Sequence, residues 1–177
     1  MGREFSLSEQ LEVKIGPLLR ARNLRLVLAE SCTGGMIGNR ITNIPGSSDY
    51  YLGSITAYAY EAKEKILGVD HEALLKFGAV SREIALEMAR GARKALAGSF
   101  PLDNLIGISV TGIAGPGGGM PHKPVGLVYI GMSALGGDRV WKFLWKGTRV
   151  ENKVSSSDAA LTLLLDYLEG HLPPETD

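Results

Sequence analysis

The sequence of 177 residues predicts an α/β protein, a three-layer α/β/α sandwich with a mixed sheet. Short continuous apolar runs, typical of strands buried on both faces, occur at residues 24–30 and 104–111. Segments with a helical spacing of apolar residues separate these runs, and two adjacent strand patterns follow the second run. No internal repeat or linker interrupts the chain, so we expect residues 1–177 to form a single domain.

The first third of the chain alternates helical and strand patterns. Ser6 and Glu9 resemble a capping box at the start of the first helix. Pro45 is expected to end the second helix, because a proline disfavours helical backbone in the residue before it. The expected elements are a helix to about residue 22, a strand at 24–30, a helix at 36–44 and a strand at 50–60, the last rich in aromatic and β-branched residues.

The rest of the chain carries clearer boundary signals. Asp70 and Ser81 are predicted N-caps, and Gly78 is a predicted helix stop. The expected helices lie at 61–68, 71–77, 82–98 and 152–172, and the expected strands at 104–111, 125–134 and 139–146. The final residues PPETD are expected to form a frayed tail.

The composition argues against several classes of function. Nineteen basic and nineteen acidic residues cancel, so the chain lacks the basic balance that phosphate-backbone binding needs, and we expect no nucleic-acid partner. No apolar stretch is long enough to cross a bilayer, and the N-terminal residues lack the apolar core of a secretory signal. A single cysteine rules out an internal disulfide and suits a reducing compartment. We therefore expect a cytoplasmic protein with no membrane partner.

The stretch AESCTGG at residues 29–35 joins a predicted strand to a predicted helix, where open α/β sheets bind ligands. Free backbone amides at a helix N-terminus favour negative charge, so this turn can serve as a helix cap or as an oxyanion hole. The local pattern alone favours a cap by Ser31 or Thr33. The alternative is that Ser31 is a nucleophile.

A nucleophilic serine needs a base to accept its proton. The chain has three histidines, and none lies in a triad signature: His71, His122 and His171. Cys32 faces the same difficulty and is better interpreted as a small buried thiol. The remaining base is a lysine whose pKa is lowered from about 10.4 towards roughly 7–8. Lys63 and Lys65 both follow the aromatic strand, and spacing alone does not distinguish a base from a solvated surface group.

A glycine-rich loop, TGIAGPGGG at residues 111–119, follows the second buried strand. Glycine permits close backbone approach, which suits a phosphate or carboxylate, although a plain flexible turn is an equally good interpretation. The loop lacks the Walker A and dinucleotide-binding patterns. Arg149 and Lys153 are candidate cations for a phosphate, with a solvated helix end as the alternative. Residues 70–72 resemble metal ligands only superficially, because adjacent side chains diverge, so we expect no metal site.

Four segments, taken together and in order, resemble the CinA C-terminal domain family, whose enzymatic members are nicotinamide-nucleotide amidases. The segments are AESCTGG, GAVS at 78–81, the TGIAGPGGG loop and KPVG at 123–126. The resemblance runs from about residue 6 to 172. It implies a Ser-Lys amidohydrolase that converts nicotinamide mononucleotide to nicotinate mononucleotide and ammonia. The reaction that it implies needs no metal and no organic cofactor.

The resemblance also assigns the reacting groups. Ser31 matches the family's serine nucleophile, and Lys63 matches its lysine base. With Ser31 attacking the amide, we expect the backbone amides of Thr33 and Gly34 to stabilise the oxyanion.

The substrate-binding residues that the resemblance implies come from three segments. Tyr58 aligns with the tyrosine that opens the motif around the lysine, Thr111 precedes the glycine loop, and Arg149 matches an arginine before the last helix. Gly112 and Gly115 of the loop, together with Arg149, are expected to hold the ribose and phosphate of a small nucleotide.

The sequence departs from the family pattern at two positions. Tyr60 replaces a common asparagine three residues before Lys63, and Lys153 replaces a common arginine. These departures bear on the choice of substrate more than on the reaction class. The alternatives are a non-catalytic nucleotide-binding protein with the same fold, and a hydrolase of another small amide. We expect a homo-oligomer in either case.

Overall fold

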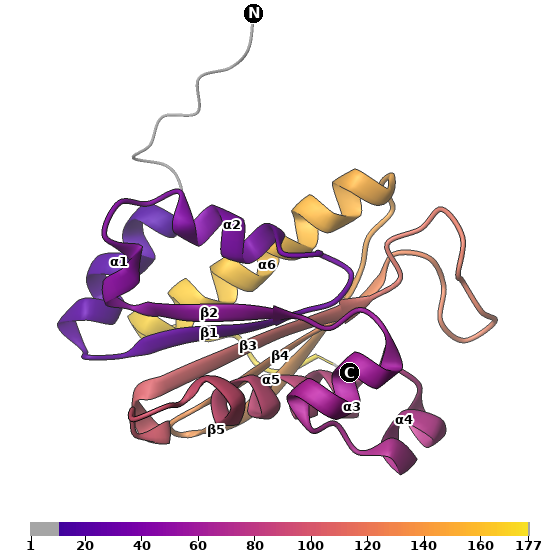
Figure 1. The fold of residues 1–177 in the computed structure, drawn as a ribbon. Coiled ribbons are helices and arrows are strands. Elements are labelled where there is room, and N and C mark those ends of the chain that lie inside the picture. Colours follow the sequence, from indigo (N-terminus) through magenta and orange to yellow (C-terminus); the bar gives the residue numbers. More distant parts are fainter. Residues whose placement is uncertain (1–10, 177) are drawn as a thin grey trace, which may run out of the picture.

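The computed structural model describes residues 11–176, which form a five-stranded mixed sheet between two layers of helices (Figure 1). The strands lie in the order β2-β1-β3-β4-β5. They are β1 (Arg25–Glu30), β2 (Tyr51–Thr56), β3 (Leu105–Gly112), β4 (Leu127–Ala134) and β5 (Gly137–Leu144). β1 is parallel to β2 and β3, whereas β4 is antiparallel to β3 and β5. The predicted α/β/α sandwich with a mixed sheet is confirmed.

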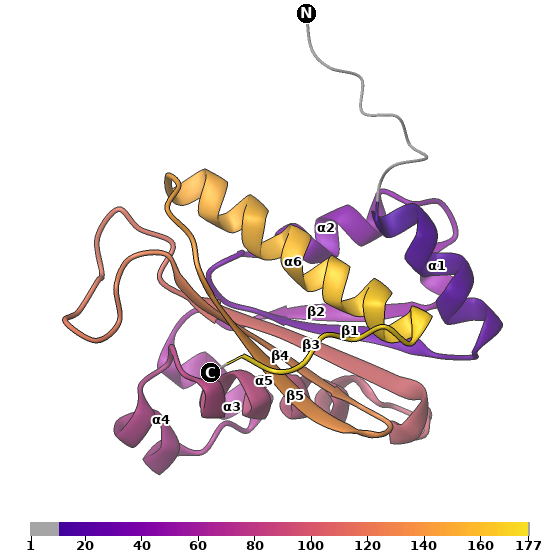
Figure 2. The same ribbon diagram turned by 180° about the vertical axis from the view of Figure 1, so that it is seen from behind.

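The helices divide between the two faces of the sheet (Figure 2). One layer holds α1 (Leu11–Ala21), α2 (Met36–Thr42) and α6 (Arg149–Glu169). The other holds α3 (Tyr60–Leu67), α4 (His71–Phe77) and α5 (Arg82–Leu96). Short 3₁₀ turns, η2 (Ser47–Asp49) and η3 (Leu102–Asn104), precede β2 and β3.

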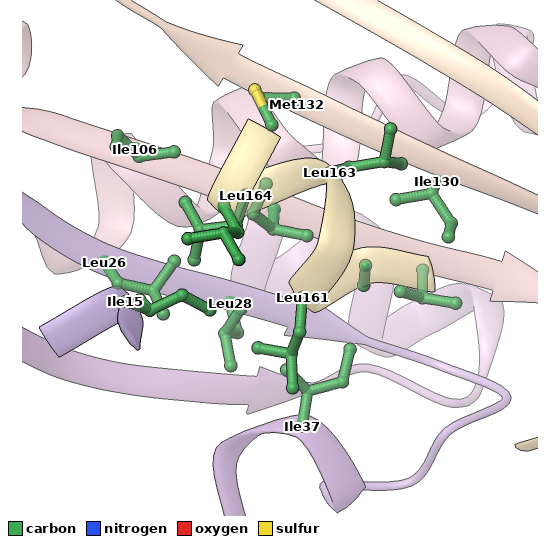
Figure 3. Packing of buried hydrophobic residues seen from close by; sticks show 14 of the residues in the cluster. Ile15, Leu26, Leu28, Ile37, Ile106, Ile130, Met132, Leu161, Leu163 and Leu164 are labelled. Carbon is green, nitrogen blue, oxygen red and sulfur yellow. The ribbon is translucent and has the colours of Figure 1, made fainter. Parts of the chain in front are cut away.

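The alternation of side chains along β1 explains its continuous apolar run. Leu26 and Leu28 point into the core beneath α1, α2 and α6, where Figure 3 places Ile15, Ile37 and Leu161 around them. The intervening residues, Val27 and Ala29, belong to the second core, on the side of α3 to α5. A strand buried on both faces needs apolar residues at every position.

The predicted helix caps at Asp70 and Ser81 are confirmed. The carboxylate of Asp70 accepts a hydrogen bond from the Ala73 amide at 2.8 Å, and Ser81 Oγ accepts one from the Ile84 amide at 3.3 Å. α4 ends at Phe77, before Gly78. The predicted capping box at residues 6–9 lies outside the described residues.

The predicted strand at 50–60 is wrong at its end. β2 stops at Thr56, and Tyr60 is already the first residue of α3. The carbonyl oxygens of Ala57 and Tyr58 accept hydrogen bonds from the side chain of Lys63. Strand propensity at residues 57–60 is therefore overridden by a buried polar contact that the local pattern does not contain.

The C-terminal part also differs from the expectation. α6 begins three residues earlier than predicted, because Thr148 and Glu151 form a capping box. The expected frayed tail instead lies along β5, where Glu175 Oε1 accepts a hydrogen bond from the Val140 amide at 2.9 Å. The indole of Trp141 donates to the carbonyl oxygen of Pro174 at 3.0 Å. α6 also ends three residues earlier than expected, at Glu169, and the remaining expected boundaries differ from the observed ones by two residues or fewer.

Candidate active site

A cavity of about 240 Å³ opens at the carboxyl ends of β1 and β3, the edge where α/β sheets bind ligands. Its walls come from the turn after β1, the segment between β2 and α3, the turn before α5, the glycine loop and the start of α6. Seven of the predicted site residues line it: Ser31, Tyr58, Lys63, Thr111, Gly112, Gly115 and Arg149.

The side chains of Ser31 and Lys63 meet inside this cavity. Lys63 Nζ lies 3.0 Å from Ser31 Oγ, although the two residues are 32 positions apart. The meeting follows from the sheet, because β1 and β2 are neighbouring parallel strands with Glu30 opposite Thr56. The turn that carries Ser31 and the segment that leads to Lys63 therefore leave the sheet side by side.

Lys63 is almost completely buried, with 1% of its surface exposed. Besides Ser31, its amine contacts the carbonyl oxygens of Ala57 at 2.7 Å and Tyr58 at 3.1 Å. Burial lowers the pKa of Lys63 from 10.5 to about 8, because desolvation disfavours the charged form. In the neutral amine, the two carbonyls accept both N–H groups, which leaves the nitrogen lone pair for the hydroxyl of Ser31.

The neighbouring thiol of Cys32 is in a different state. Its side chain is buried in the core beneath α1, α2 and α6, as the sequence predicted. Burial raises the pKa of Cys32 to about 12, so the thiol stays protonated at neutral pH. The chain therefore presents a serine beside a lysine, with an unreactive thiol as its neighbour.

The cap of α2 is a correction to the sequence analysis. Neither Ser31 nor Thr33 caps this helix, because its first residue is Met36 and the N-cap position is Gly35. The carboxylate of Glu30 takes this role and accepts hydrogen bonds from the amides of Gly35 at 3.0 Å, Ile37 at 3.1 Å and Gly38 at 2.9 Å, as well as from the Thr33 and Ser54 hydroxyls.

The backbone amides of Thr33 and Gly34, which were predicted to stabilise an oxyanion, differ in their hydrogen bonds. The Gly34 amide donates to the carbonyl oxygen of Ser31 at 3.1 Å, so this donor is occupied within the turn. Within residues 11–176, no oxygen accepts a hydrogen bond from the amides of Cys32 or Thr33. Neither Thr33 nor Gly34 lines the cavity, whereas Cys32 does. The Cys32 amide is therefore the better candidate, because it has no acceptor and belongs to a residue of the cavity wall, and the Thr33 amide is the other donor of this turn that has no acceptor.

The glycine loop forms one wall of the cavity, and residues of α6 hold it in place. Arg149 donates to the carbonyl oxygen of Gly115 at 2.7 Å and to the hydroxyl oxygen of Tyr58 at 3.1 Å. Asn152, which is buried, donates to the carbonyl oxygen of Ala114 at 3.0 Å. Arg149 thus bridges the loop and the segment that leads to Lys63, at the mouth of the cavity.

The two departures from the family pattern lie in different places. Tyr60 does not line the cavity, and its hydroxyl oxygen accepts a hydrogen bond from the Ala79 amide at 3.2 Å. Lys153 extends towards the nucleophile turn, with Nζ 3.7 Å from the position that a Cβ on Gly34 would occupy. Tyr60 therefore supports the turn before α5, and Lys153 brings a positive charge to the turn after β1.

Sequence reasoning missed Glu30 and Asn152. Glu30 is the one charged residue in the apolar strand pattern of 24–30 apart from Arg25 at its start, and this was a usable signal. The sequence indicates Asn152 only as the start of a helix, because the two hydrogen bonds of its side chain, with Gly147 and Ala114, involve loops that no local pattern connects to it.

In the part of the chain that the structure describes, no three His, Cys, Asp or Glu side chains are grouped as metal ligands. Over the same residues, no helix combines the length and apolar character needed to span a membrane.

The fold and the cavity together define an α/β protein with a candidate small-ligand site where parallel strands meet helices. The chain belongs to the CinA family, because the profile of the CinA C-terminal domain matches residues 8–168. The family, rather than an individual activity, is what this match establishes.

Comparison with known proteins agrees with this assignment. A putative competence-damage inducible protein of Moorella thermoacetica is 51% identical over 156 residues, which cover 88% of this chain and 36% of that protein. A CinA-like protein of Salinibacter ruber is 46% identical over 85% of this chain and 35% of its own length. The chain thus spans little more than a third of these relatives.

A solved structure matches over nearly the whole chain. The crystal structure of the competence/damage inducible protein CihA from Agrobacterium tumefaciens has a TM-score of 0.83 and 36% sequence identity, covering 96% of this chain and 99% of that one. A CinA superfamily protein from Escherichia coli gives a TM-score of 0.81 at 29% identity, covering 93% and 94%. The α/β fold described above is therefore the fold of the CinA superfamily.

Proposed function

We propose that this protein is an amidohydrolase that converts nicotinamide mononucleotide to nicotinate mononucleotide and ammonia, a reaction of pyridine-nucleotide salvage. The observation that carries the proposal is the contact between Lys63 Nζ and Ser31 Oγ, 3.0 Å long and buried at the end of the cavity. A serine within hydrogen-bond reach of a lysine with a lowered pKa is the arrangement that nucleophilic catalysis requires.

The first half of the reaction forms an acyl-enzyme. Ser31 Oγ attacks the carboxamide carbon while neutral Lys63 accepts the hydroxyl proton. The amides of Cys32 and Thr33 stabilise the negative oxygen of the tetrahedral intermediate, and loss of one such donor costs about 3 kcal/mol. The C–N bond then breaks, and Lys63 returns its proton to the leaving nitrogen, which departs as ammonia.

The second half of the reaction restores the enzyme. A water molecule gives a proton to Lys63 and attacks the acyl carbon, and the ester bond to Ser31 breaks with return of that proton to Oγ. The carboxylic acid that forms loses its proton to solvent, where the released ammonia can take it up, so the carboxylate product carries one more negative charge than the amide. No step requires an electron acceptor or a further reactant.

Thr111 is suited to the amide end of this substrate. Its side chain is buried in the wall of the cavity, and its hydroxyl donates to the carbonyl oxygen of Ala79 at 2.7 Å. With its proton used in that bond, the Thr111 oxygen can only accept a further hydrogen bond. It therefore favours a group that carries N–H, such as a carboxamide, over a carboxylate.

Two cations support a phosphate group on the substrate. Arg149 lies at the mouth of the cavity, and Lys153 reaches the turn around Gly34. The glycine loop contributes Gly115, Gly117 and Gly118 to the cavity wall, and the backbone of such a loop can approach an anion closely. Binding of a remote phosphate would orient the carboxamide towards Ser31.

The proposal is tested by measuring ammonia released from nicotinamide mononucleotide by the purified protein, with Ser31→Ala and Lys63→Ala as controls. We expect release by the wild type and none by either variant while both stay folded. A panel of other small amides separates the alternatives. If the protein hydrolyses only another amide, that amide and not nicotinamide mononucleotide is its substrate. If it binds the nucleotide without hydrolysing it, the protein is a non-catalytic member of the family.

A further inference from the structure

The side chain of Glu30 takes no part in the proposed reaction steps. It is completely buried at the end of β1, immediately before Ser31, and its carboxylate accepts five hydrogen bonds. A buried carboxylate is costly unless its oxygens are paired in this way. The position of this carboxylate, one residue from the proposed nucleophile, suggests more than a contribution to stability.

The two oxygens of Glu30 bind different parts of the site. Oε2 accepts from the Thr33 hydroxyl at 2.8 Å and from the amides of Gly35 and Ile37, so it holds the turn that carries Ser31. Oε1 accepts from the Gly38 amide and from the Ser54 hydroxyl at 3.1 Å, which lies on β2. One carboxylate therefore ties the nucleophile turn to the strand that precedes Lys63.

The backbone of Glu30 contacts the same two segments. Its carbonyl oxygen accepts a hydrogen bond from the Ala57 amide at 2.9 Å, and the carbonyl of Ala57 in turn accepts from Lys63. The next residue, Ser31, donates its amide to the carbonyl oxygen of Val110 on β3. The distance between Ser31 Oγ and Lys63 Nζ thus depends on contacts that meet at Glu30.

We propose that Glu30 is the positioning residue of this site, which sets the separation between Ser31 and Lys63 by joining the turn after β1 and the first amides of α2 to Ser54 on β2. A serine that capped the helix would direct its oxygen to the backbone amides. Because Glu30 accepts from those amides, Ser31 Oγ is left for Lys63. The catalytic part of this inference rests on the proposed function.

The test compares Glu30→Gln with Glu12→Gln. Glutamine at 30 turns an N–H₂ group towards donors whichever way the amide is oriented, and so disturbs the turn. Glu12 is an equally suitable glutamate for a control, because it is buried on α1, where it pairs with Arg40, away from the cavity. Both variants are first checked by circular dichroism and assayed well below their melting temperatures.

The main measurement is the rate at which a fluorophosphonate labels Ser31, confirmed by peptide mapping. We expect Glu30→Gln to lower this rate by about 100-fold, the effect of roughly 1 Å of misplacement, and Glu12→Gln to stay within about twofold of the wild type. Labelling of Glu30→Gln at the wild-type rate would overturn the inference. Equal losses in both variants would also overturn it, because the effect would then be general loss of packing.

A second pair of variants changes one hydrogen bond at a time. Thr33→Val removes the hydroxyl that ties the turn to Oε2, and Ser54→Ala removes the hydroxyl on Oε1. We expect both to lower kcat several-fold with little change in KM, because both loosen the same carboxylate. An effect on KM alone, or none in either variant, would contradict a positioning role.

Failure of this inference can be told apart from failure of the proposed function. Labelling of wild-type Ser31 without release of ammonia from nicotinamide mononucleotide refutes the substrate, and the comparison of Glu30→Gln with Glu12→Gln still decides the role of Glu30. A wild-type protein that takes no label at Ser31 would overturn both proposals.

Discussion

A single hydrogen bond joins Ser31 Oγ and Lys63 Nζ, which lie 3.0 Å apart. The lysine reaches this position because the carbonyl oxygens of Ala57 and Tyr58 hold its amine from the other side. A lysine fixed in this way needs no third side chain to orient it. Under the proposed function, these two residues would supply what a Ser-His-Asp triad supplies in three.

The nucleophile is tested by changing Ser31 and its neighbour separately. We expect Ser31→Ala to lower ammonia release by at least about 10³-fold, whereas Cys32→Ser should keep activity within about 10-fold. The reason is that the pKa of Cys32 is raised to about 12, which keeps the thiol protonated. Steady-state rates measure both effects. Loss of activity in Cys32→Ser with activity retained in Ser31→Ala would identify the thiol as the nucleophile.

The lowered pKa of Lys63 predicts a pH-dependent stability. Between about 8 and 10.5 the unfolded chain holds a proton on Lys63 that the folded chain has released. The wild type should therefore gain stability relative to Lys63→Met as pH rises from 8 to 10. Melting temperatures measure this difference, since 1 kcal/mol corresponds to roughly 2–4 °C in a chain of this size. A difference that stays constant over this range would contradict a lowered pKa.

Arg149 is expected to recognise the phosphate of the substrate. Arg149→Ala should raise KM for nicotinamide mononucleotide by about 10-fold or more, because a charge-assisted contact contributes about 1.5–3 kcal/mol. Nicotinamide riboside, which lacks the phosphate, should be affected much less, and steady-state kinetics with both compounds measure the difference.

The exposed Arg139 on β5 provides the control for Arg149, since Arg139→Ala removes the same charge far from the cavity. This variant should leave KM for both compounds unchanged. Equal losses for the mononucleotide and the riboside in Arg149→Ala would mean that Arg149 supports the glycine loop instead of binding phosphate.

Asn152 is expected to hold the glycine loop. Asn152→Ala leaves the Gly147 amide and the Ala114 carbonyl oxygen without their buried partner, which should cost about 1–3 kcal/mol of stability and raise KM. Ser156→Ala is the matched control, because Ser156 is buried on the same helix and its hydroxyl bonds to the Trp145 indole and the Asn152 carbonyl oxygen, not to the glycine loop. Denaturant unfolding and kinetics separate the two effects. A rise in KM of the same size in both variants would contradict this role.

Much of the fold was predictable because its signals are local. The caps at Asp70 and Ser81 each involve a side chain and an amide three residues away. The buried strands at 24–30 and 104–111 appear as continuous apolar runs. The end of β2 was not predictable in this way, because the carbonyls at 57 and 58 are held by the amine of Lys63, which no strand propensity describes.

The site was predictable only in part. The motif resemblance selected Ser31 and Lys63, whereas local pattern left cap and nucleophile both open. The charge of Glu30 within an apolar run marks it as unusual, but its role could not be predicted, because that role depends on α2 beginning at Met36, so that three amides converge on one carboxylate. Its partner on β2, Ser54, is brought close only by the pairing of the two strands.

The central claim is that neutral Lys63 activates Ser31, and the pH dependence of kcat/KM for ammonia release tests it most directly. The value should rise through an apparent pKa of about 8 and level off above it, because only the neutral amine accepts the proton. None of the three histidines lines the cavity. Two results would contradict the account: a pH profile of kcat/KM that still titrates near pH 6.5 in Lys63→Ala, or a wild-type kcat/KM that still rises steeply above pH 10.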